Sequence, residues 1–340
     1  MDAFLVTHRP NIFYLTGFTG SAGTLLVCLA EAALVVDGRY AIQAREEVRT
    51  ARVRIMRGDL LAGVAALLRA TKRTRIAFEA AHLSVQQRHD LATSTGRSVR
   101  WLPVCGWVEK LRAVKDEQEL ELMQKAAELA SGVFEDVLAL IRPGVREVEL
   151  AAEIEYRMRR GGASGPAFET IVASGPRSAL PHARPTTKPL TGNELVVFDL
   201  GAILRGYCSD LTRTVFLGRP PGRIRRWYSA VRDAQEAARE TLRPGVQAGR
   251  VDSAARRVLR RHGLLRYFSH STGHGLGIEV HEEPRLAFRQ PARIEAGNVV
   301  TLEPGVYVPG FGGIRVEDDV VVHASGARLL TRVTRDLIQL

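Results

Sequence analysis

The amino-acid sequence predicts an α+β protein with a small α/β domain over residues 1–110 and a larger α+β domain over residues 111–340. Its 340 residues are enough for two domains of ordinary size. The first region alternates short β-type runs with helical ones. The second places two blocks of paired strands and helices in succession, which suits a pseudo-symmetric domain although no sequence repeat is visible.

The N-terminal region is predicted to alternate short strands and helices. Strands are expected at the apolar runs FLVT, GTLLVCL, AALVVDGRY and RIAFEA. A glycine-rich turn separates the first two runs, at Gly17, Gly20 and Gly23. Helices are expected over residues 41–48, 60–70 and 85–92.

A long amphipathic helix is predicted next, in WVEKLRAVKDEQELELMQKAAELASGVFEDVLALIRPG. Its apolar residues recur at spacings of three and four, at Leu120, Met123, Ala127, Ala130 and Phe134. The helix is expected to stop at Pro143 and Gly144. The stretch around residues 105–115 is the predicted domain boundary.

The second region is predicted to hold three more helices and a series of strands. The helices are expected over residues 148–160, 222–241 and 249–262. The strands are expected over residues 168–173, 194–200, 212–216, 277–281, 298–301, 305–308 and 314–322.

Composition excludes several classes of protein. The chain is 45% hydrophobic and 25% charged, as globular proteins are, and no run reaches the length of a membrane span. Cys28, Cys105 and Cys208 form neither a CxxC pair nor an even disulfide set, which indicates a reducing, cytoplasmic location. The net charge of +11 comes from dispersed arginines without a nucleic-acid-binding motif, so polyanion binding is expected only at low salt.

Five residues of metal-binding types lie in short, distinctive strings. They are Asp199 in VVFDLG, Asp210 in YCSDLTRT, His274 in GHGLG, Glu303 in TLEPG and Glu317 in IRVED. Four carboxylates and one imidazole suit one or two divalent ions such as Mn²⁺, Co²⁺ or Zn²⁺. A hairpin could bring Asp199 and Asp210 side by side, where a cation would relieve their repulsion. Taken singly, each would be an ordinary strand-end residue.

Histidines supply further candidates. His270, His274 and His281 cluster in a glycine-rich segment whose glycines permit close backbone approach. We expect His274 to be the ligand, with His270 and His281 beside it or facing substrate. A helical zinc pair at His270 and His274 would lack the glutamate of HExxH. His182, on a proline-bracketed loop, is a candidate donor to a substrate carbonyl. The remaining histidines are expected to be structural or surface residues: His8, His82, His89, His262 and His323.

Period-two spacing places Arg315 and Glu317 on one face of the strand GIRVEDD. Arg315 could orient that carboxylate or meet a substrate charge, and a cross-strand salt bridge is the simpler alternative. Asp318 and Asp319 are expected to face solvent unless one pairs with an arginine.

In this order and spacing, the strings resemble the pita-bread metallopeptidases, and among them the Xaa-Pro group of prolidase and aminopeptidase P. FYLTGFTGSAGTLLV and VVDGRY resemble the family's N-terminal domain, and the segment from FETIVASGPRSALPHARP to GGIRVEDDVVV follows its catalytic domain. The resemblance implies a creatinase/prolidase-type domain over residues 1–110 and a pita-bread catalytic domain over residues 111–340. Relatives normally carry one more helix before the DAFLVT strand.

Carried over residue by residue, the resemblance implies two divalent ions, with Mn²⁺ as the expected occupant and Co²⁺ or Zn²⁺ as alternatives. Asp199 would hold one ion, His274 and Glu303 would hold the other, and Asp210 and Glu317 would bridge both. The ions would acidify a water molecule and polarise the scissile carbonyl.

The resemblance also implies catalytic and substrate-binding roles. Glu303 would pass a proton from the water to the proline nitrogen, and His182 and His281 would contact the substrate and stabilise the oxyanion. His270 and Arg315 are assigned to the substrate side.

Arg285 in HEEPR matches an arginine that meets the proline carboxylate in prolidase-like relatives, although aminopeptidase P-like relatives carry similar strings. The expected activity is therefore that of an Xaa-Pro dipeptidase, with an Xaa-Pro aminopeptidase as the alternative. The expected partners are a peptide with proline at its second position and a second copy of the chain, with no specific nucleic acid and no membrane. A non-catalytic pita-bread binding protein or a creatinase-like enzyme would lack part of the ligand set, and a methionine aminopeptidase would not need residues 1–110.

Overall fold

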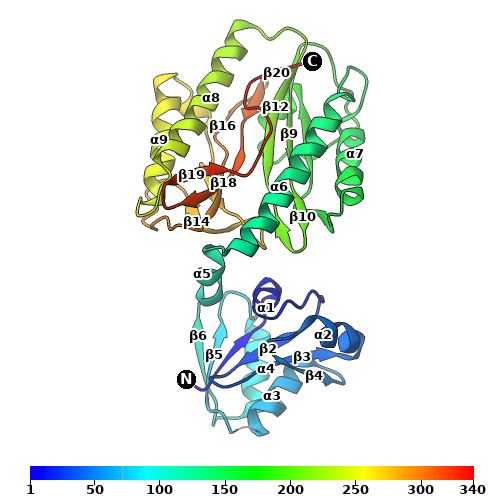
Figure 1. Ribbon diagram of the computed structural model, residues 1–340, viewed down its shortest axis with the longest axis vertical. Coiled ribbons are helices and arrows are strands. Elements are labelled where there is room, and N and C mark those ends of the chain that lie inside the picture. Colours follow the sequence, from blue (N-terminus) through cyan, green and yellow to red (C-terminus); the bar gives the residue numbers. More distant parts are fainter. Residues whose placement is uncertain (71) are drawn as a thin grey trace. The chain divides into compact units, whose positions relative to one another are not determined.

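The computed structural model describes residues 1–70 and 72–340, which divide into two compact units, Met1–Arg112 and Ala113–Leu340 (Figure 1). Each unit has its own sheets and its own hydrophobic cores.

The N-terminal unit alternates strands and helices. In chain order they are β1 (Ala3–Val6), α1 (Arg9–Thr16), β2 (Thr24–Val27), β3 (Ala32–Asp37), α2 (Ala41–Glu47), β4 (Arg52–Met56), α3 (Leu60–Ala70), β5 (Arg75–Glu79), α4 (Val85–Thr95), β6 (Arg100–Val104) and α5 (Trp107–Ala113), which ends at the boundary.

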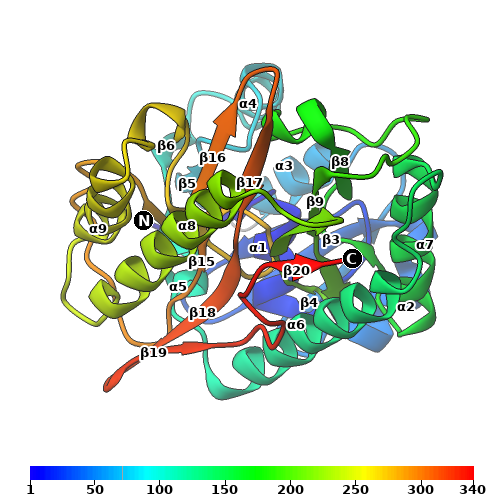
Figure 2. The ribbon, with the colours of Figure 1, turned by 90° about the horizontal axis from the view of Figure 1, so that it is seen from above.

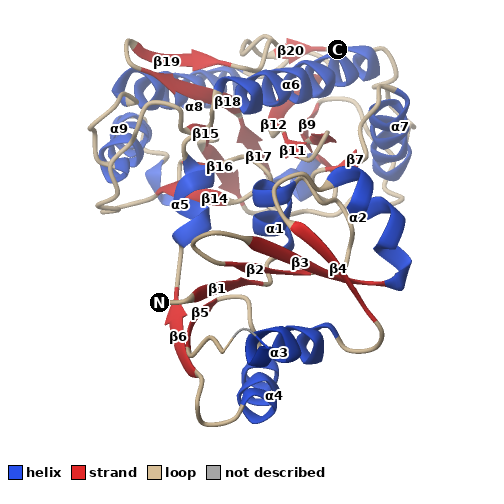
Figure 3. Cartoon of the chain, turned by 60° about the horizontal axis from the view of Figure 1, so that its bottom comes forward, coloured by secondary structure: helices blue, strands red, loops and turns tan. Residues whose placement is uncertain are grey.

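These strands form one mixed sheet in the order β4-β3-β2-β1-β5-β6, in which β2 alone runs antiparallel to both of its neighbours. Residues alternate between its two faces. Ala3 and Leu5 join the core beneath α3 and α4, whereas Phe4 and Val6 join the core beneath α1 and α2. Figure 3 shows these two helix pairs on opposite faces of the sheet.

The sequence patterns do not predict α1, β4 or β6. Helix α1 has Pro10 in its first turn and ends at Gly17, whose φ of 76° lets its N–H donate to the Phe13 carbonyl. Its eight residues hold too few apolar repeats to establish a helical period. Strands β4 and β6 form the two edges of the sheet, where β4 is a short and largely exposed run with two arginines and β6 contains Pro103.

The second unit contains four α-helices and fourteen strands among its described elements. They are α6 (Glu117–Leu138), α7 (Glu147–Arg160), β7 (Gly165–Pro166), β8 (Ile171–Ser174), β9 (Glu194–Leu200), β10 (Ala202–Leu204), β11 (Tyr207–Cys208), β12 (Leu211–Leu217), α8 (Gly222–Thr241), α9 (Ala248–Arg261), β13 (Gly273–Gly275), β14 (Glu282–Leu286), β15 (Val299–Leu302), β16 (Gly305–Val308), β17 (Gly312–Arg315), β18 (Asp318–His323), β19 (Gly326–Leu329) and β20 (Ile338–Gln339).

Two helix pairs enclose two main sheets in this unit. The sheet β20-β12-β9-β8 packs on α6 and α7 through residues such as Phe134, Ile154 and Phe198. The sheet β14-β13-β15-β18-β19 and the ribbon of β16 and β17 pack on α8 and α9. Figure 2 shows one helix pair on each side of the strands. The predicted α+β class is confirmed.

The predicted long helix is interrupted between α5 and α6. Asp116 starts α6 because its carboxylate accepts the Glu119 N–H at 2.8 Å, while the Glu119 carboxylate accepts the Asp116 N–H at 2.9 Å. Just before it, Val114 pairs with Asn298. The apolar period continues through the break and hides it, although the capping pattern D-x-x-E is visible in KDEQE. The helix also ends earlier than predicted, at Leu138.

Two predicted strands also differ. Residues 277–281 form bends, and the strand lies earlier, at β13. A Cβ at Gly273 would lie 1.9 Å from the Thr301 carbonyl oxygen, so glycine permits this pairing. The predicted strand over residues 314–322 is broken between β17 and β18, where Glu317 lies. No described helix is long and apolar enough to cross a membrane.

Candidate metal centre

The two aspartates of the candidate site lie at one end of a strand pair. Strands β9 and β12 run antiparallel with Asp199 opposite Thr212, and Asp210 directly precedes β12. The two carboxylates therefore belong to the same end of the pair. Both residues are buried.

The other three candidates come from the second sheet. His274 is the central residue of β13, Glu303 directly follows β15 and Glu317 directly precedes β18. Because β13 and β18 both pair with β15, these residues are brought close together. The Glu317 N–H donates to the Thr212 carbonyl at 3.1 Å, which joins the two sheets at the site.

The donor atoms of these residues converge. One atom each from Asp210, His274 and Glu317 lies within 4.8 Å of the others. His274 Nε2 lies 3.8 Å from both Asp210 Oδ2 and Glu303 Oε1. His274 Nδ1 lies 3.0 Å from the Gly275 carbonyl oxygen, so Nδ1 carries the proton and Nε2 presents its lone pair to the carboxylates.

The electrostatics of this cluster favour a cation. Burial, reinforced by neighbouring carboxylates, raises the pKa of Asp210 and Glu303 well above their usual range and that of Glu317 to about 8. Burial lowers the pKa of His274 to about 4, which keeps the ring neutral. Asp199 Oδ1 and Asp210 Oδ1 are buried without a hydrogen-bond donor among the described residues. This oxygen-rich set with one neutral imidazole fits a divalent metal.

Arg315 lies behind Asp199. Its buried guanidinium forms an ion pair with Asp199 Oδ2 and donates to Thr212 Oγ1 at 3.0 Å and to the Tyr307 hydroxyl at 2.8 Å. The cross-strand ion pair therefore joins Arg315 to Asp199 and not to Glu317. Thr212 completes the link, because its hydroxyl donates to Glu317 Oε2 at 2.6 Å. A contact of Arg315 with a substrate charge stays a prediction.

His270 is engaged at both ring nitrogens. Nδ1 lies 2.8 Å from the Ser271 carbonyl oxygen and Nε2 lies 2.9 Å from the Tyr307 hydroxyl, so Tyr307 donates to a neutral ring. Burial lowers the pKa of His270 to about 4. Both ring nitrogens are thus engaged within the protein, and a contact of His270 with substrate stays a prediction. Sequence reasoning missed Tyr307, which GVYV presents as an ordinary strand residue.

His182, His281 and Arg285 are exposed. The His281 ring lies 4.4 Å from the His274 ring, between centroids. Burial lowers the pKa of His281, and electrostatic interactions with His182 and Arg285 contribute to the same direction. Their assignment to substrate stays a prediction.

Asp318 and Asp319 are buried, so the expectation that they face solvent is wrong. Asp318 pairs with Arg213 at 2.6 Å, and Asp319 Oδ2 accepts the Asp210 N–H at 3.0 Å. Arg213 donates its remaining four N–H groups to the main-chain carbonyls of residues 212, 317, 333 and 334. These residues hold the backbone of two candidate ligands, Asp210 and Glu317, from behind.

The N-terminal unit holds a second cluster of ligating types, His8, His82 and Glu109, within 4.8 Å of one another. The two imidazoles stack face to face, 3.6 Å apart and nearly parallel. Nitrogen lone pairs lie in the ring planes, so parallel rings cannot both direct a lone pair at one ion. This geometry describes a stacked histidine pair with a carboxylate at 3.3 Å from His82 rather than a metal centre.

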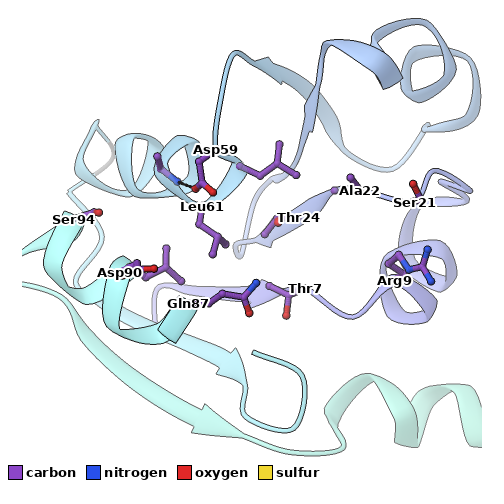
Figure 4. A pocket seen from close by; sticks show the side chains of 14 residues that line it. Thr7, Arg9, Ser21, Ala22, Thr24, Asp59, Leu61, Gln87, Asp90 and Ser94 are labelled. Carbon is purple, nitrogen blue, oxygen red and sulfur yellow. Dashed lines mark hydrogen bonds between the residues drawn. The ribbon is translucent and has the colours of Figure 1, made fainter. Parts of the chain in front are cut away.

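A pocket of about 490 Å³ also lies in the N-terminal unit, between α3, α4 and the end of β1 (Figure 4). Its polar side chains already serve local structure. Asp59 accepts the Ala62 N–H at the start of α3, and Asp90 accepts from Gln86. Gln87 belongs to the capping box that starts α4. None of the candidate site residues lines this pocket.

A buried cluster of carboxylates and one neutral imidazole between two helix-backed sheets defines a metal-dependent hydrolase of pita-bread type. The chain belongs to the metallopeptidase family M24, whose model matches residues 121–324. Residues 1–114 match the creatinase/prolidase N-terminal domain.

Within this family, the chain is similar to peptidases named for cleavage at X-Pro bonds. The Xaa-Pro dipeptidase of Pyrococcus horikoshii is 35% identical over 339 residues, covering 99% of this chain and 95% of that protein. A solved Xaa-Pro dipeptidase from Bacillus anthracis superposes with a TM-score of 0.95 at 36% identity, over 100% of this chain and 95% of that one. An X-Pro aminopeptidase from Thermotoga maritima gives a TM-score of 0.94 at 37% identity, over 100% and 98%.

Proposed function

We propose that this chain is a metal-dependent Xaa-Pro dipeptidase. The observation that carries the proposal is the convergence of Asp210, His274 and Glu317 within one buried donor cluster. The chain resembles Xaa-Pro dipeptidases over nearly its whole length, in sequence and in fold. All five candidate ligand residues are present in the sequence, which supports a catalytic member of the family over a non-catalytic relative that has lost them.

We assign two divalent ions to the site, with Mn²⁺ as the expected occupant. Asp199 would hold one ion, His274 and Glu303 the other, and Asp210 and Glu317 both. The unpartnered oxygens of Asp199 and Asp210 and the lone pair of His274 Nε2 support this assignment. When bound, the ions supply Lewis-acid polarisation of the scissile carbonyl and a nucleophilic water near neutral pH.

The chain's own residues would move protons and hold the substrate. Glu303 would accept a proton from the water and return it to the proline nitrogen, since its carboxylate lies in the donor cluster, 3.8 Å from His274 Nε2. His182 and His281 are exposed and can donate hydrogen bonds to the carbonyl oxygen as negative charge develops there. Arg315 keeps Asp199 oriented, and Tyr307 links Arg315 to His270.

Arg285 supports a dipeptidase over an aminopeptidase. Its side chain is exposed on β14, four residues after His281, where it can meet the free carboxylate of a C-terminal proline. The alternative is an Xaa-Pro aminopeptidase, because the fold of the X-Pro aminopeptidase from Thermotoga maritima matches this chain almost equally well. We also predict that the chain forms a homodimer. A cytoplasmic location is predicted from its three free cysteines.

The test measures proline release from Ala-Pro and cleavage of Ala-Pro-Ala by protein stripped with EDTA and reloaded with Mn²⁺, Co²⁺ or Zn²⁺. We expect activity on Ala-Pro that chelation abolishes and Mn²⁺ restores. Protein with a full complement of metal that cleaves neither peptide would refute the enzyme, and preference for Ala-Pro-Ala would favour the aminopeptidase.

A variant separates the two specificities further. Arg285→Gln should raise KM for Ala-Pro by about 10- to 100-fold, the loss expected for one charged hydrogen bond. Ala-Pro-amide lacks the carboxylate and serves as the matched substrate, so its KM should not change. Equal effects on both substrates would remove Arg285 from carboxylate recognition.

A further inference from the structure

Lys115 and Glu282 form a buried ion pair beside the candidate site. Lys115 Nζ lies 3.0 Å from Glu282 Oε2, and the side chains are 1% and 5% exposed. Taking two charges out of water is expensive, and an apolar pair of similar size would often stabilise a fold as well. A buried ion pair at this place therefore points to a need for fixed geometry.

The backbone of Lys115 is anchored to the segment that leads into Glu303. The Lys115 N–H donates to the Gly297 carbonyl at 2.9 Å. The Asn298 side-chain amide donates to the Ala113 carbonyl at 2.8 Å, and Val114 bridges to Asn298. Strand β15 begins directly after Asn298 and ends just before Glu303. The backbone of Lys115 is therefore fixed to a segment that leads to a candidate ligand.

Glu282 organises the turn that precedes it. Its carboxylate binds Lys115 with one oxygen and accepts the Glu279 N–H with the other, at 3.1 Å. Within the turn, the Gly277 N–H donates to the Glu279 carbonyl at 3.1 Å. A Cβ at Gly277 would lie 2.5 Å from Glu282 Oε2, so the carboxylate fills the space where a side chain would be.

This turn carries His281. Residues 277–281 form bends and not a strand, so no ladder of sheet hydrogen bonds fixes their positions. His281 is exposed, yet its ring lies edge-on against the ring of ligand candidate His274 at 4.4 Å. The Cys208 N–H donates to the Gly277 carbonyl at 2.7 Å at the start of the turn. The Glu282 carboxylate, next to His281 in the chain, ties the end of the turn to the buried ammonium of Lys115.

We propose that the Lys115–Glu282 ion pair is a positioning device that fixes the turn over residues 277–282 and thereby holds His281 against His274. The inference rests on the proposed function, in which His281 contacts the substrate. Lys115 and Glu282 are positioning residues, since neither is assigned to the metal or the substrate.

The first experiment is a cycle of Lys115→Met, Glu282→Met and the double variant, assayed on Ala-Pro with Mn²⁺ content measured in each. Each single change removes one partner of the buried ion pair and should reduce both stability and kcat. The double variant should regain thermal stability and full metal content, while kcat stays about 10- to 100-fold low, as for lost support of a site residue. Recovery of wild-type kcat in the double variant would overturn the proposal, because the pair would then be purely structural.

Gly277→Ala perturbs the same device without removing a charge. Its methyl group must displace the Glu282 carboxylate, so kcat should fall with metal content unchanged. Lys188→Met is the control for loss of a lysine–glutamate pair, because Lys188 pairs with Glu194 at 3.1 Å in the same unit, although its side chain is more exposed than that of Lys115. The control should retain wild-type kcat, and an equal loss in the control would overturn a specific role for Lys115.

Hydrogen exchange of residues 276–286 measures the turn independently of catalysis. Exchange should accelerate in the double variant and in Gly277→Ala but not in Lys188→Met. If metal-loaded wild-type protein cleaves no X-Pro peptide, the proposed function fails. The hydrogen-exchange measurement still tests whether the Lys115–Glu282 ion pair fixes the turn. Unchanged exchange in the double variant would overturn the proposal even if the enzyme is active.

Discussion

Replacement of Glu317 by glutamine should stabilise the metal-free protein while impairing the metal-bound one. Burial, with the neighbouring Asp199 carboxylate, raises the pKa of Glu317 from 4.5 to about 8. Such a shift corresponds to roughly 5 kcal/mol. Because Asp210 and Glu303 titrate in the same cluster, the effect is shared among them, and we expect about 2 kcal/mol or more from Glu317 alone.

The sign of the pH dependence follows from proton uptake. Between pH 4.5 and about 8 the folded, metal-free protein binds a proton at Glu317 that the unfolded chain does not bind. The free energy of unfolding therefore falls as pH rises through this window. Glutamine keeps the shape and carries no charge, so Glu317→Gln removes this part of the slope. The two proteins should differ little near pH 4.5 and most above pH 8.

Calorimetry in EDTA across pH 5 to 9 measures the free energy of unfolding of both proteins. The unfolding transition to follow is the one that shifts when Mn²⁺ is added. In saturating Mn²⁺ the order should reverse, because the wild type gains about 2.7 kcal/mol at a metal concentration 100 times Kd and the variant binds metal more weakly. Parallel pH curves for the two metal-free proteins would refute the reasoning, since Glu317 would then be ionised in the folded state.

Three further substitutions test other parts of the site. Asp210→Ala should abolish activity and reduce bound metal measured by mass spectrometry, and retained turnover would argue against a shared ligand. His182→Ala should lower kcat about 100-fold, the loss typical of one oxyanion donor, with metal content intact; metal loss would instead identify a ligand. Tyr307→Phe removes the hydroxyl between Arg315 and His270 and should cost about 1 kcal/mol of stability, while an unchanged melting temperature would show that this hydroxyl contributes nothing.

The sequence located the candidate ligands because each stands at a strand end or beside glycine. Asp199 ends an apolar strand, and Glu303 precedes a Pro-Gly turn, so both positions follow from local patterns. Their convergence depends on pairings between distant strands, such as β15 with β18. Local patterns do not encode such pairings, and the family resemblance supplied this part.

The supporting residues could not be predicted, because their partners lie far away in the chain. Arg315 bonds to Asp199 across 116 residues, and Lys115 bonds to Glu282 across 167. Asp319 looks like an exposed residue of an acidic run until its partner, the Asp210 N–H, is known. The break before α6 was predictable in principle, since its capping box is local.

Arg213 has a consequence for how the chain matures during synthesis. Two of its five donors bond to residues 333 and 334, and β12, the strand that contains Arg213, pairs with β20 at residues 338 and 339. The backbone support of Glu317 is therefore incomplete until these later residues have left the ribosome. A nascent chain that already contains every candidate ligand would still lack a finished site, and metal uptake should await the emergence of residues 333–339.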